Sequence, residues 1–248
     1  MKVIKTPSFE LAIYAKGNER AEKLALVLPG RLDTKDYVHM TSHVDFLASK
    51  GFYAISIDPP FSWESPGDIA NYSTTNYLKA VNELIDQINK PTLLLGHSRG
   101  GAVSMLASRN PKAEALVLAM ANYGNTTEPA PNEIENGWAV SLRDLPPGYT
   151  RTVEKKKFLL PLSYFEDSRQ HKPAEALKQF EGPKLIICGA RDTFITPKEV
   201  KETYDQLIEP KMFLELNTEH DYRLHDDMVE AVNQAIGEFI DKYLEKPE

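Results

Sequence analysis

Short apolar runs rich in branched residues alternate along the chain with longer amphipathic segments. Each run has the length of a buried strand, and each segment has apolar residues at helical spacing. The runs lie at residues 24–28, 52–57, 91–95, 115–119, 184–189 and 212–216, after a strand expected at 9–14. Helices are expected at 36–50, 75–89, 99–109, 197–208 and 226–244. The alternation predicts an α/β fold with a mostly parallel central sheet flanked by helices, because parallel strands need long crossover connections.

The alternation breaks between residues 122 and 180. This segment contains no strong apolar strand, and prolines and scattered aromatic residues punctuate it. A structureless stretch of this length is uncommon inside a compact domain unless it has a function, and its aromatic content favours an ordered lid. We therefore expect a core formed by residues 1–121 and 181–248, with residues 122–180 inserted as a small cap.

Charge and composition narrow the possible partners and location. The chain of 248 residues has 29 basic and 36 acidic side chains, for a net charge of −7, whereas nucleic-acid binding usually needs a basic surface. The short basic run at 155–157 is interpreted as solvated.

No apolar run reaches the roughly 20 residues of a membrane span, and the N-terminus lacks the apolar core of a signal peptide. A cytoplasmic protein is expected, with its single cysteine, Cys188, buried as a small hydrophobic residue.

The motif Gly96-His97-Ser98-Arg99-Gly100 lies between the expected strand 91–95 and the helix that follows. A serine nucleophile projects from a sharp strand-to-helix turn, so the residues two before and two after it must lack bulk. Gly96 and Gly100 meet that requirement. The turn also leaves the backbone N–H of Arg99 at a helix N-terminus, directed at the place where an oxyanion would form.

With the acidic and histidine residues that follow it, this motif resembles the α/β-hydrolase superfamily over essentially the whole chain. The family order is nucleophile, acid, histidine. Asp192 comes just after the strand at 184–189, in a loop similar to the family's acid loop, and His220 follows the last strand. The resemblance implies that Ser98 is the nucleophile, Asp192 the acid and His220 the base.

Other residues compete for these roles. His225 is an alternative base, but it precedes two aspartates at the expected start of the last helix, where it would be a capping or surface histidine. Asp58 also ends a strand, and an aspartate there is commonly structural in the family. His97 is interpreted as packing beside the serine turn.

The expected oxyanion hole departs from the family pattern. Members usually have His-Gly after the strand that here ends at Leu28, whereas this chain has Pro29-Gly30-Arg31. Proline lacks an N–H, so the second donor is Arg31 or, as the alternative, Leu32. The Arg31 side chain is either solvated or reaches an anionic group of the substrate.

No residue pattern implies a metal or cofactor. His39 and His43 are four residues apart on an expected helix, but Met40 follows His39 where a zinc protease has glutamate. We interpret them as two exposed histidines. No glycine-rich phosphate loop follows any strand.

The predicted function is hydrolysis of small carboxylic esters through an acyl-enzyme. The expected cap is similar in size and placement to the insert of cinnamoyl and feruloyl esterases, and Trp63 and Trp138 are candidates to line a substrate pocket. The same triad could instead cleave a thioester, an amide or a carbon–carbon bond, and a non-catalytic binding protein on this fold is a further alternative. The partner is a small acyl compound, and the sequence leaves the natural substrate and oligomeric state open.

Overall fold

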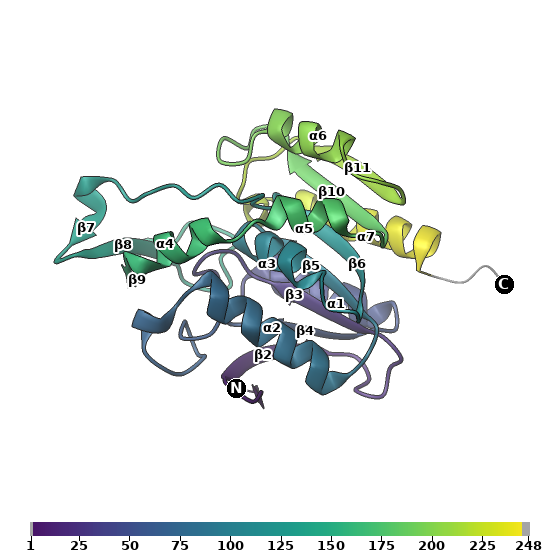
Figure 1. The fold of residues 1–248 in the computed structure, drawn as a ribbon, viewed down its shortest axis with the longest axis horizontal. Coiled ribbons are helices and arrows are strands. Elements are labelled where there is room, and N and C mark those ends of the chain that lie inside the picture. Colours follow the sequence, from purple (N-terminus) through teal and green to yellow (C-terminus); the bar gives the residue numbers. More distant parts are fainter. Residues whose placement is uncertain (1, 245–248) are drawn as a thin grey trace.

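An eight-stranded sheet forms the centre of the computed structural model, which describes residues 2–244 (Figure 1). In spatial order its strands are β1 (Lys2–Lys5), β2 (Glu10–Lys16), β4 (Tyr53–Ile57), β3 (Leu24–Leu28), β5 (Thr92–His97), β6 (Ala113–Ala119), β10 (Lys184–Gly189) and β11 (Lys211–Leu216). The pairs β1–β2 and β2–β4 are antiparallel, and the other pairs are parallel. This arrangement confirms the predicted α/β class.

Helices cover both faces of this sheet. Strand β3 shows why: Leu26 and Leu28 belong to one hydrophobic cluster, whereas Ala25 and Val27 belong to another on the opposite face. The first cluster includes residues of α2 (Thr74–Ile88), α3 (Arg99–Ala107) and α6 (Pro197–Asp205), and the second includes residues of α1 (Val38–Ser49) and α7 (Asp226–Tyr243). Cys188 is buried in the first cluster, as predicted.

The segment between β6 and β10 forms a second, smaller sheet. Its antiparallel strands are β7 (Ile134–Glu135), β8 (Trp138–Asp144) and β9 (Lys155–Pro161), followed by α4 (Ser163–Gln170) and α5 (Pro173–Gln179). The sequence did not predict these strands. In β9, Phe158 and Leu160 are buried while Leu159 between them is exposed, so the segment has no continuous apolar run. The sheet projects to the left of the core in Figure 1, whereas α5 packs on α3.

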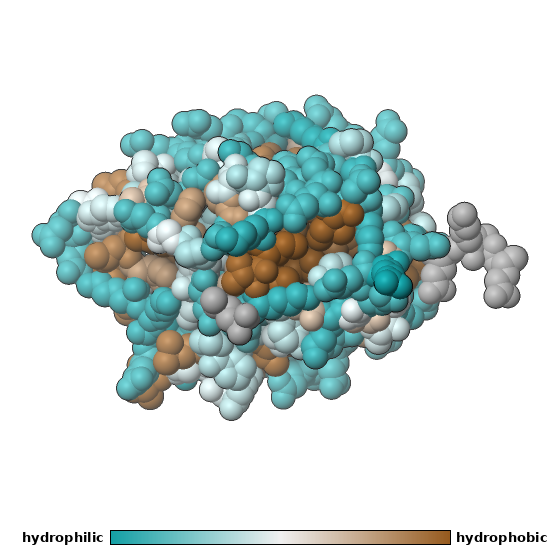
Figure 2. Space-filling model, turned by 90° about the horizontal axis from the view of Figure 1, so that it is seen from below, coloured by the Kyte–Doolittle hydropathy of each residue, from teal (hydrophilic) through white to brown (hydrophobic). Residues whose placement is uncertain are grey.

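The projecting sheet carries much of the exposed apolar surface. Large apolar side chains that are exposed there are Ile134, Leu142, Leu145, Tyr149, Val153, Leu159 and Leu162. Figure 2 shows hydrophobic residues at this end of the molecule, and a further hydrophobic area near the middle of an otherwise hydrophilic face. Within residues 2–244, no helix combines the length and the apolar character that crossing a bilayer requires.

Asp58, directly after β4, joins two loops at one edge of the sheet. Its fully buried carboxylate accepts hydrogen bonds from Thr34 Oγ1 (2.7 Å), Lys35 N (2.9 Å) and Glu64 N (3.1 Å). The Lys35 ammonium, itself buried, lies 3.5 Å from Asp58 Oδ2. Burial raises the pKa of Asp58, although Lys35 and these hydrogen bonds oppose the rise. Each of these contacts stabilises the loop that follows β3.

Replacing Asp58 with alanine is expected to lower the free energy of unfolding by about 3 kcal/mol. It removes the buried acceptor of the Thr34 hydroxyl and of the Lys35 and Glu64 N–H groups, and one of three carboxylates around the Lys35 ammonium. Urea unfolding followed by circular dichroism measures the loss. The control is Asp205→Ala, which removes an exposed ion pair with Lys201 and should change stability by less than about 1 kcal/mol. Equal effects of the two substitutions would contradict a structural role for Asp58.

Candidate active site

Ser98 lies on a strained turn between β5 and α3. Its backbone has φ +51° and ψ −118°, a region that residues with a side chain rarely adopt. The flanking glycines make this turn possible, since a Cβ on Gly100 would overlap the carbonyl of Leu28 in β3 and a Cβ on Gly96 would overlap the backbone of Gly100. The motif therefore forms the sharp strand-to-helix turn that its spacing predicted.

The structure brings Ser98, His220 and Asp192 together. His220 Nε2 lies 2.9 Å from Ser98 Oγ, and His220 Nδ1 lies 2.7 Å from Asp192 Oδ2. The three residues follow β5, β11 and β10, whose carboxyl ends lie at the same edge of the sheet, with β6 between β5 and β10. Each pair is within hydrogen-bonding distance, so a proton can pass from the serine hydroxyl to the imidazole.

Asp192 is held so that it stays ionised. Its Oδ1 accepts hydrogen bonds from the backbone N–H groups of Phe194 (2.8 Å) and Ile195 (3.0 Å), which leaves Oδ2 for His220. Burial alone would raise the pKa of this carboxyl, but the hydrogen bond and charge of His220 and the two backbone donors lower it below its usual value. An ionised Asp192 accepts the Nδ1–H of His220, so Nε2 faces Ser98 as a proton acceptor.

The competing histidines lie near the triad but have other contacts. The buried His97 donates from Nε2 to the backbone carbonyl of His220 (3.1 Å), and its Nδ1 is 3.6 Å from Asp33 Oδ2. His97 thus supports the backbone of His220. His225 is the residue before α7, and its Nε2 lies 3.0 Å from Glu219 Oε2. Only His220 contacts both Ser98 and Asp192 among the described histidines.

The expectation of two exposed histidines on α1 was wrong. His39 and His43 are fully buried, because their spacing of four residues places both on the face of α1 that packs into the protein. His43 Nδ1 lies 2.6 Å from Asn233 Oδ1, and its Nε2 lies 2.8 Å from the hydroxyl of Tyr222. Burial lowers the pKa of His43 to about 4. Residues 2–244 contain no group of three His, Cys, Asp or Glu residues arranged to hold a metal.

The loop after β3 supplies the candidate oxyanion hole. The Leu32 N–H donates to the hydroxyl of Tyr72 (2.9 Å), and the Leu32 carbonyl accepts from Trp63 Nε1 (2.8 Å). The Leu32 N–H is therefore occupied, and Arg31 stays the candidate for the second donor. Within residues 2–244, the backbone N–H groups of Arg31 and Arg99 have no hydrogen-bond partner. Both are free to bind a developing oxyanion beside Ser98.

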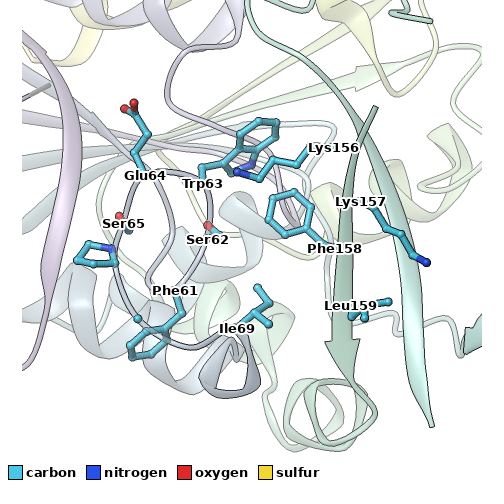
Figure 3. A pocket seen from close by; sticks show the side chains of 12 residues that line it. Phe61, Ser62, Trp63, Glu64, Ser65, Ile69, Lys156, Lys157, Phe158 and Leu159 are labelled. Carbon is cyan, nitrogen blue, oxygen red and sulfur yellow. The ribbon is translucent and has the colours of Figure 1, made fainter. Parts of the chain in front are cut away.

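The two tryptophans lie outside the cavity that contains Ser98. Trp63 lines a separate pocket of about 400 Å³, beside Lys156 and Phe158 of β9 (Figure 3). Its indole N–H donates to the Leu32 carbonyl, so Trp63 helps to fix the loop after β3 that contains Arg31 and Leu32. Trp138 begins β8 opposite Pro161, next to the short β7 strand, and lines neither pocket. The sequence could not show this, because β8, which carries Trp138, and β9, which packs on Trp63, were not predicted.

Ser98 and His220 open into a cavity of about 490 Å³ between the core and the inserted segment. The core contributes the loop after β3 and the start of α3, while β8, β9 and α4 form the other wall. Three arginine side chains line it: Arg31, Arg99 and Arg143. Sequence reasoning singled out Arg31 for its side chain and Arg99 only for its backbone N–H. It missed Arg143, which lies far away in the chain.

A profile of the alpha/beta hydrolase family matches residues 25–235, most of the chain. The chain belongs to the alpha/beta hydrolase family. Its sheet, serine turn and acid loop are those that the sequence resemblance implied, and membership makes it a hydrolase.

Several relatives and solved structures match most of the chain. The mouse protein named palmitoyl-protein thioesterase ABHD10, mitochondrial, is 22% identical over 225 residues, 88% of this chain and 75% of the relative. The structure of mouse alpha/beta hydrolase domain-containing protein 10 has TM-score 0.72 and 20% identity, covering 97% and 98% of the two chains. Est1E from Butyrivibrio proteoclasticus with bound ferulic acid has TM-score 0.73 and 18% identity, covering 98% and 100%.

Tyr72→Phe tests whether the hydrogen bond between the Leu32 N–H and the Tyr72 hydroxyl fixes the loop after β3 in this hydrolase. The variant removes only the hydroxyl that accepts the Leu32 N–H. We expect kcat to fall about tenfold with little change in KM, a part of the 10²–10³ that one oxyanion donor contributes. Tyr204→Phe, on α6 outside the cavity, is the matched control and should keep kcat. A Tyr72→Phe enzyme with unchanged kcat would show that this hydroxyl does not position the loop.

The lowered pKa of Asp192 implies that the stability of the protein depends on pH. Its folded-state pKa is depressed, so it contributes stability above its unfolded pKa of roughly 4, and this is lost as pH falls through the lower folded pKa. Asp192→Asn should therefore lose less stability than the wild type between pH 6 and pH 3 in thermal unfolding. Parallel pH curves for the two proteins would contradict the depressed pKa.

Proposed function

We propose that this hydrolase cleaves small carboxylic esters through an acyl-enzyme on Ser98. The observation that carries the proposal is the chain of two hydrogen bonds from Ser98 Oγ through His220 to Asp192. This arrangement raises the nucleophilicity of an otherwise weak hydroxyl at the end of a cavity large enough for a small substrate.

In the first half of the reaction, Ser98 Oγ attacks the carbonyl carbon of the ester while His220 Nε2 takes the hydroxyl proton. The backbone N–H groups of Arg99 and Arg31 bind the resulting oxyanion, and Asp192 stabilises the imidazolium. The tetrahedral intermediate collapses to the acyl-enzyme when the ester C–O bond breaks, and His220 returns the proton to the departing alcohol.

Water completes the turnover. It gives a proton to His220 as its oxygen attacks the acyl carbon. When the second tetrahedral intermediate collapses, the bond between the acyl carbon and Ser98 Oγ breaks, His220 returns the proton to Ser98, and the carboxylic acid leaves. Apart from the substrate and water, these steps use only groups of this chain. Residues 122–180 act in this scheme as a cap, because β8, β9 and α4 form one wall of the cavity.

Thioester cleavage is the second candidate. It is favoured by the rodent relatives, whose names state that they are palmitoyl-protein thioesterases. The same three residues perform it, with a thiol as the leaving group. The names of those relatives also place them in mitochondria, whereas the sequence of this chain predicts the cytoplasm, and microscopy of the tagged full chain distinguishes the two.

Ser98→Ala is expected to lower kcat for short-chain p-nitrophenyl esters by roughly 10⁴ to 10⁶ and to abolish labelling by a fluorophosphonate. Both readouts depend on the same oxygen nucleophile. The assay compares the purified full chain with the variant, with circular dichroism as the check on folding.

Ser108→Ala is the matched control. Ser108 lies at the other end of α3, where its hydroxyl bonds to the Met105 carbonyl, and it should leave both readouts unchanged. Labelling of the wild type together with cleavage of acyl thioesters but not of esters would favour the second candidate. A folded wild-type protein that neither reacts with the label nor turns over any acyl substrate would contradict the serine mechanism.

A further inference from the structure

Three arginine side chains converge on the Ser98 cavity from different elements. Arg31 follows β3, Arg99 begins α3, and Arg143 lies near the end of β8. None of the three side chains makes a hydrogen bond or an ion pair with residues 2–244. Arg99 is only 7% exposed, and the Nε of Arg143 is buried without a partner. Positive charge is therefore concentrated beside the nucleophile.

The acidic side chains around the cavity are already engaged. Asp33 faces His97, Asp221 pairs with Arg151 and Arg223, Glu128 pairs with Arg169, and Glu133 accepts from the backbone N–H of Ala130. Asp33 is the acid on which the charge of Arg143 acts, yet the two form no ion pair. No carboxylate among the described residues thus pairs with the arginines.

Placing three positive charges close together without counter-charges is energetically unfavourable for the protein without a ligand. Burial lowers the pKa of the Arg31 guanidinium, and the charges of Arg143 and Arg99 lower it further, although Tyr164 opposes them. Aromatic rings offer partial compensation, since Arg31 lies 6.0 Å from the ring centre of Phe165 and Arg99 lies 5.9 Å from that of Tyr164. Arg31 and Arg143 are partly exposed to the cavity, but Arg99 and the Nε of Arg143 are buried without a counter-charge or acceptor among the described residues. Such buried groups are uncommon unless something outside the chain completes their bonding.

We propose that Arg31, Arg99 and Arg143 form a subsite for an anionic oxygen group, a carboxylate or a phosphate, on the substrate. The inference rests on the proposed function and names the class of acyl compound that this site prefers. A guanidinium presents donors in a planar fork that matches the two oxygens of such a group.

The location of the subsite limits the size of the substrate. The backbone N–H groups of Arg31 and Arg99 are the proposed oxyanion donors, so the side chains of these two residues begin at the reacting carbonyl. An anionic group that they bind lies within about one arginine side chain of Ser98. The preferred substrate is thus a small ester or thioester with its charge a few bonds from the carbonyl, in the acyl part or in the leaving group.

Two matched substrate pairs test the preference. The first is p-nitrophenyl hydrogen adipate against p-nitrophenyl hexanoate, which differ at the far end of a six-carbon acyl chain. The second is 4-acetoxybenzoate against its methyl ester, with the charge in the leaving group. We expect kcat/KM to be roughly 10- to 100-fold higher for the anionic member of at least one pair, as a charged hydrogen bond provides. Equal or lower values in both pairs contradict the proposal.

Arg143→Gln tests the side chain that has no part in the proposed oxyanion hole. It should reduce the ratio of kcat/KM between the anionic and neutral members about tenfold, mainly by raising KM for the anionic ester. Arg109→Gln makes the same change in net charge at an exposed site on the far end of α3 and should keep the ratio. A ratio that falls equally in both variants would show a general effect of charge instead of a subsite.

Direct binding separates this proposal from the serine mechanism. Adipate and inorganic phosphate are each added to the wild type, Arg143→Gln and Arg109→Gln, and the melting temperature is measured. A rise that Arg143→Gln loses supports the subsite, and the more effective anion identifies the group it takes.

If fluorophosphonate labelling and turnover are absent but this rise in melting temperature occurs, the ester mechanism fails while the subsite stands. If labelling occurs but no anion shifts the melting temperature and neither substrate pair shows a preference, the subsite is wrong and the mechanism stands.

Discussion

The close contact between the start of α3 and the end of β3 determines the geometry of the whole site. Gly100 meets the Leu28 carbonyl directly, and this contact leaves Ser98 with a positive φ that costs roughly 1–3 kcal/mol. Buried strands on both sides of β5 maintain the strain. As a result Ser98 projects from the turn at the edge of the sheet, and the backbone N–H of Arg99, unpaired within the described part of the chain, is the next donor along the chain.

Parallel strands then collect the remaining groups at the same edge. Asp192 follows β10 and His220 follows β11, and hydrogen bonds from backbone groups fix the first while His97 supports the second. The loop after β3 is held in turn by Tyr72 and Trp63. The groups that we propose to react are thus held in place by the protein itself, which is the condition for electrostatic stabilisation of a transition state.

Much of this could be predicted from the sequence, because buried parallel strands are continuous apolar runs and the serine turn requires glycines at fixed spacing. The strands β8 and β9 could not, since neither is a continuous run of buried apolar residues and the prolines at 146, 147 and 161 suggested loops. The burial of His39 and His43 depends on contacts between distant segments, since His39 packs on His97 and Tyr222 and His43 bonds to Tyr222 and to Asn233 of α7. The convergence of Arg143 with Arg31 and Arg99 likewise appears only after the inserted sheet folds back over the serine.

The most direct test of the account is the covalent intermediate itself. The full chain is mixed with p-nitrophenyl acetate, quenched in acid within milliseconds and digested, and the peptides are weighed by mass spectrometry. The mechanism predicts an acetyl group on the peptide that contains Ser98, at Ser98, which disappears as turnover finishes. Turnover without any acylated peptide, or with the acetyl group on another residue, would contradict it.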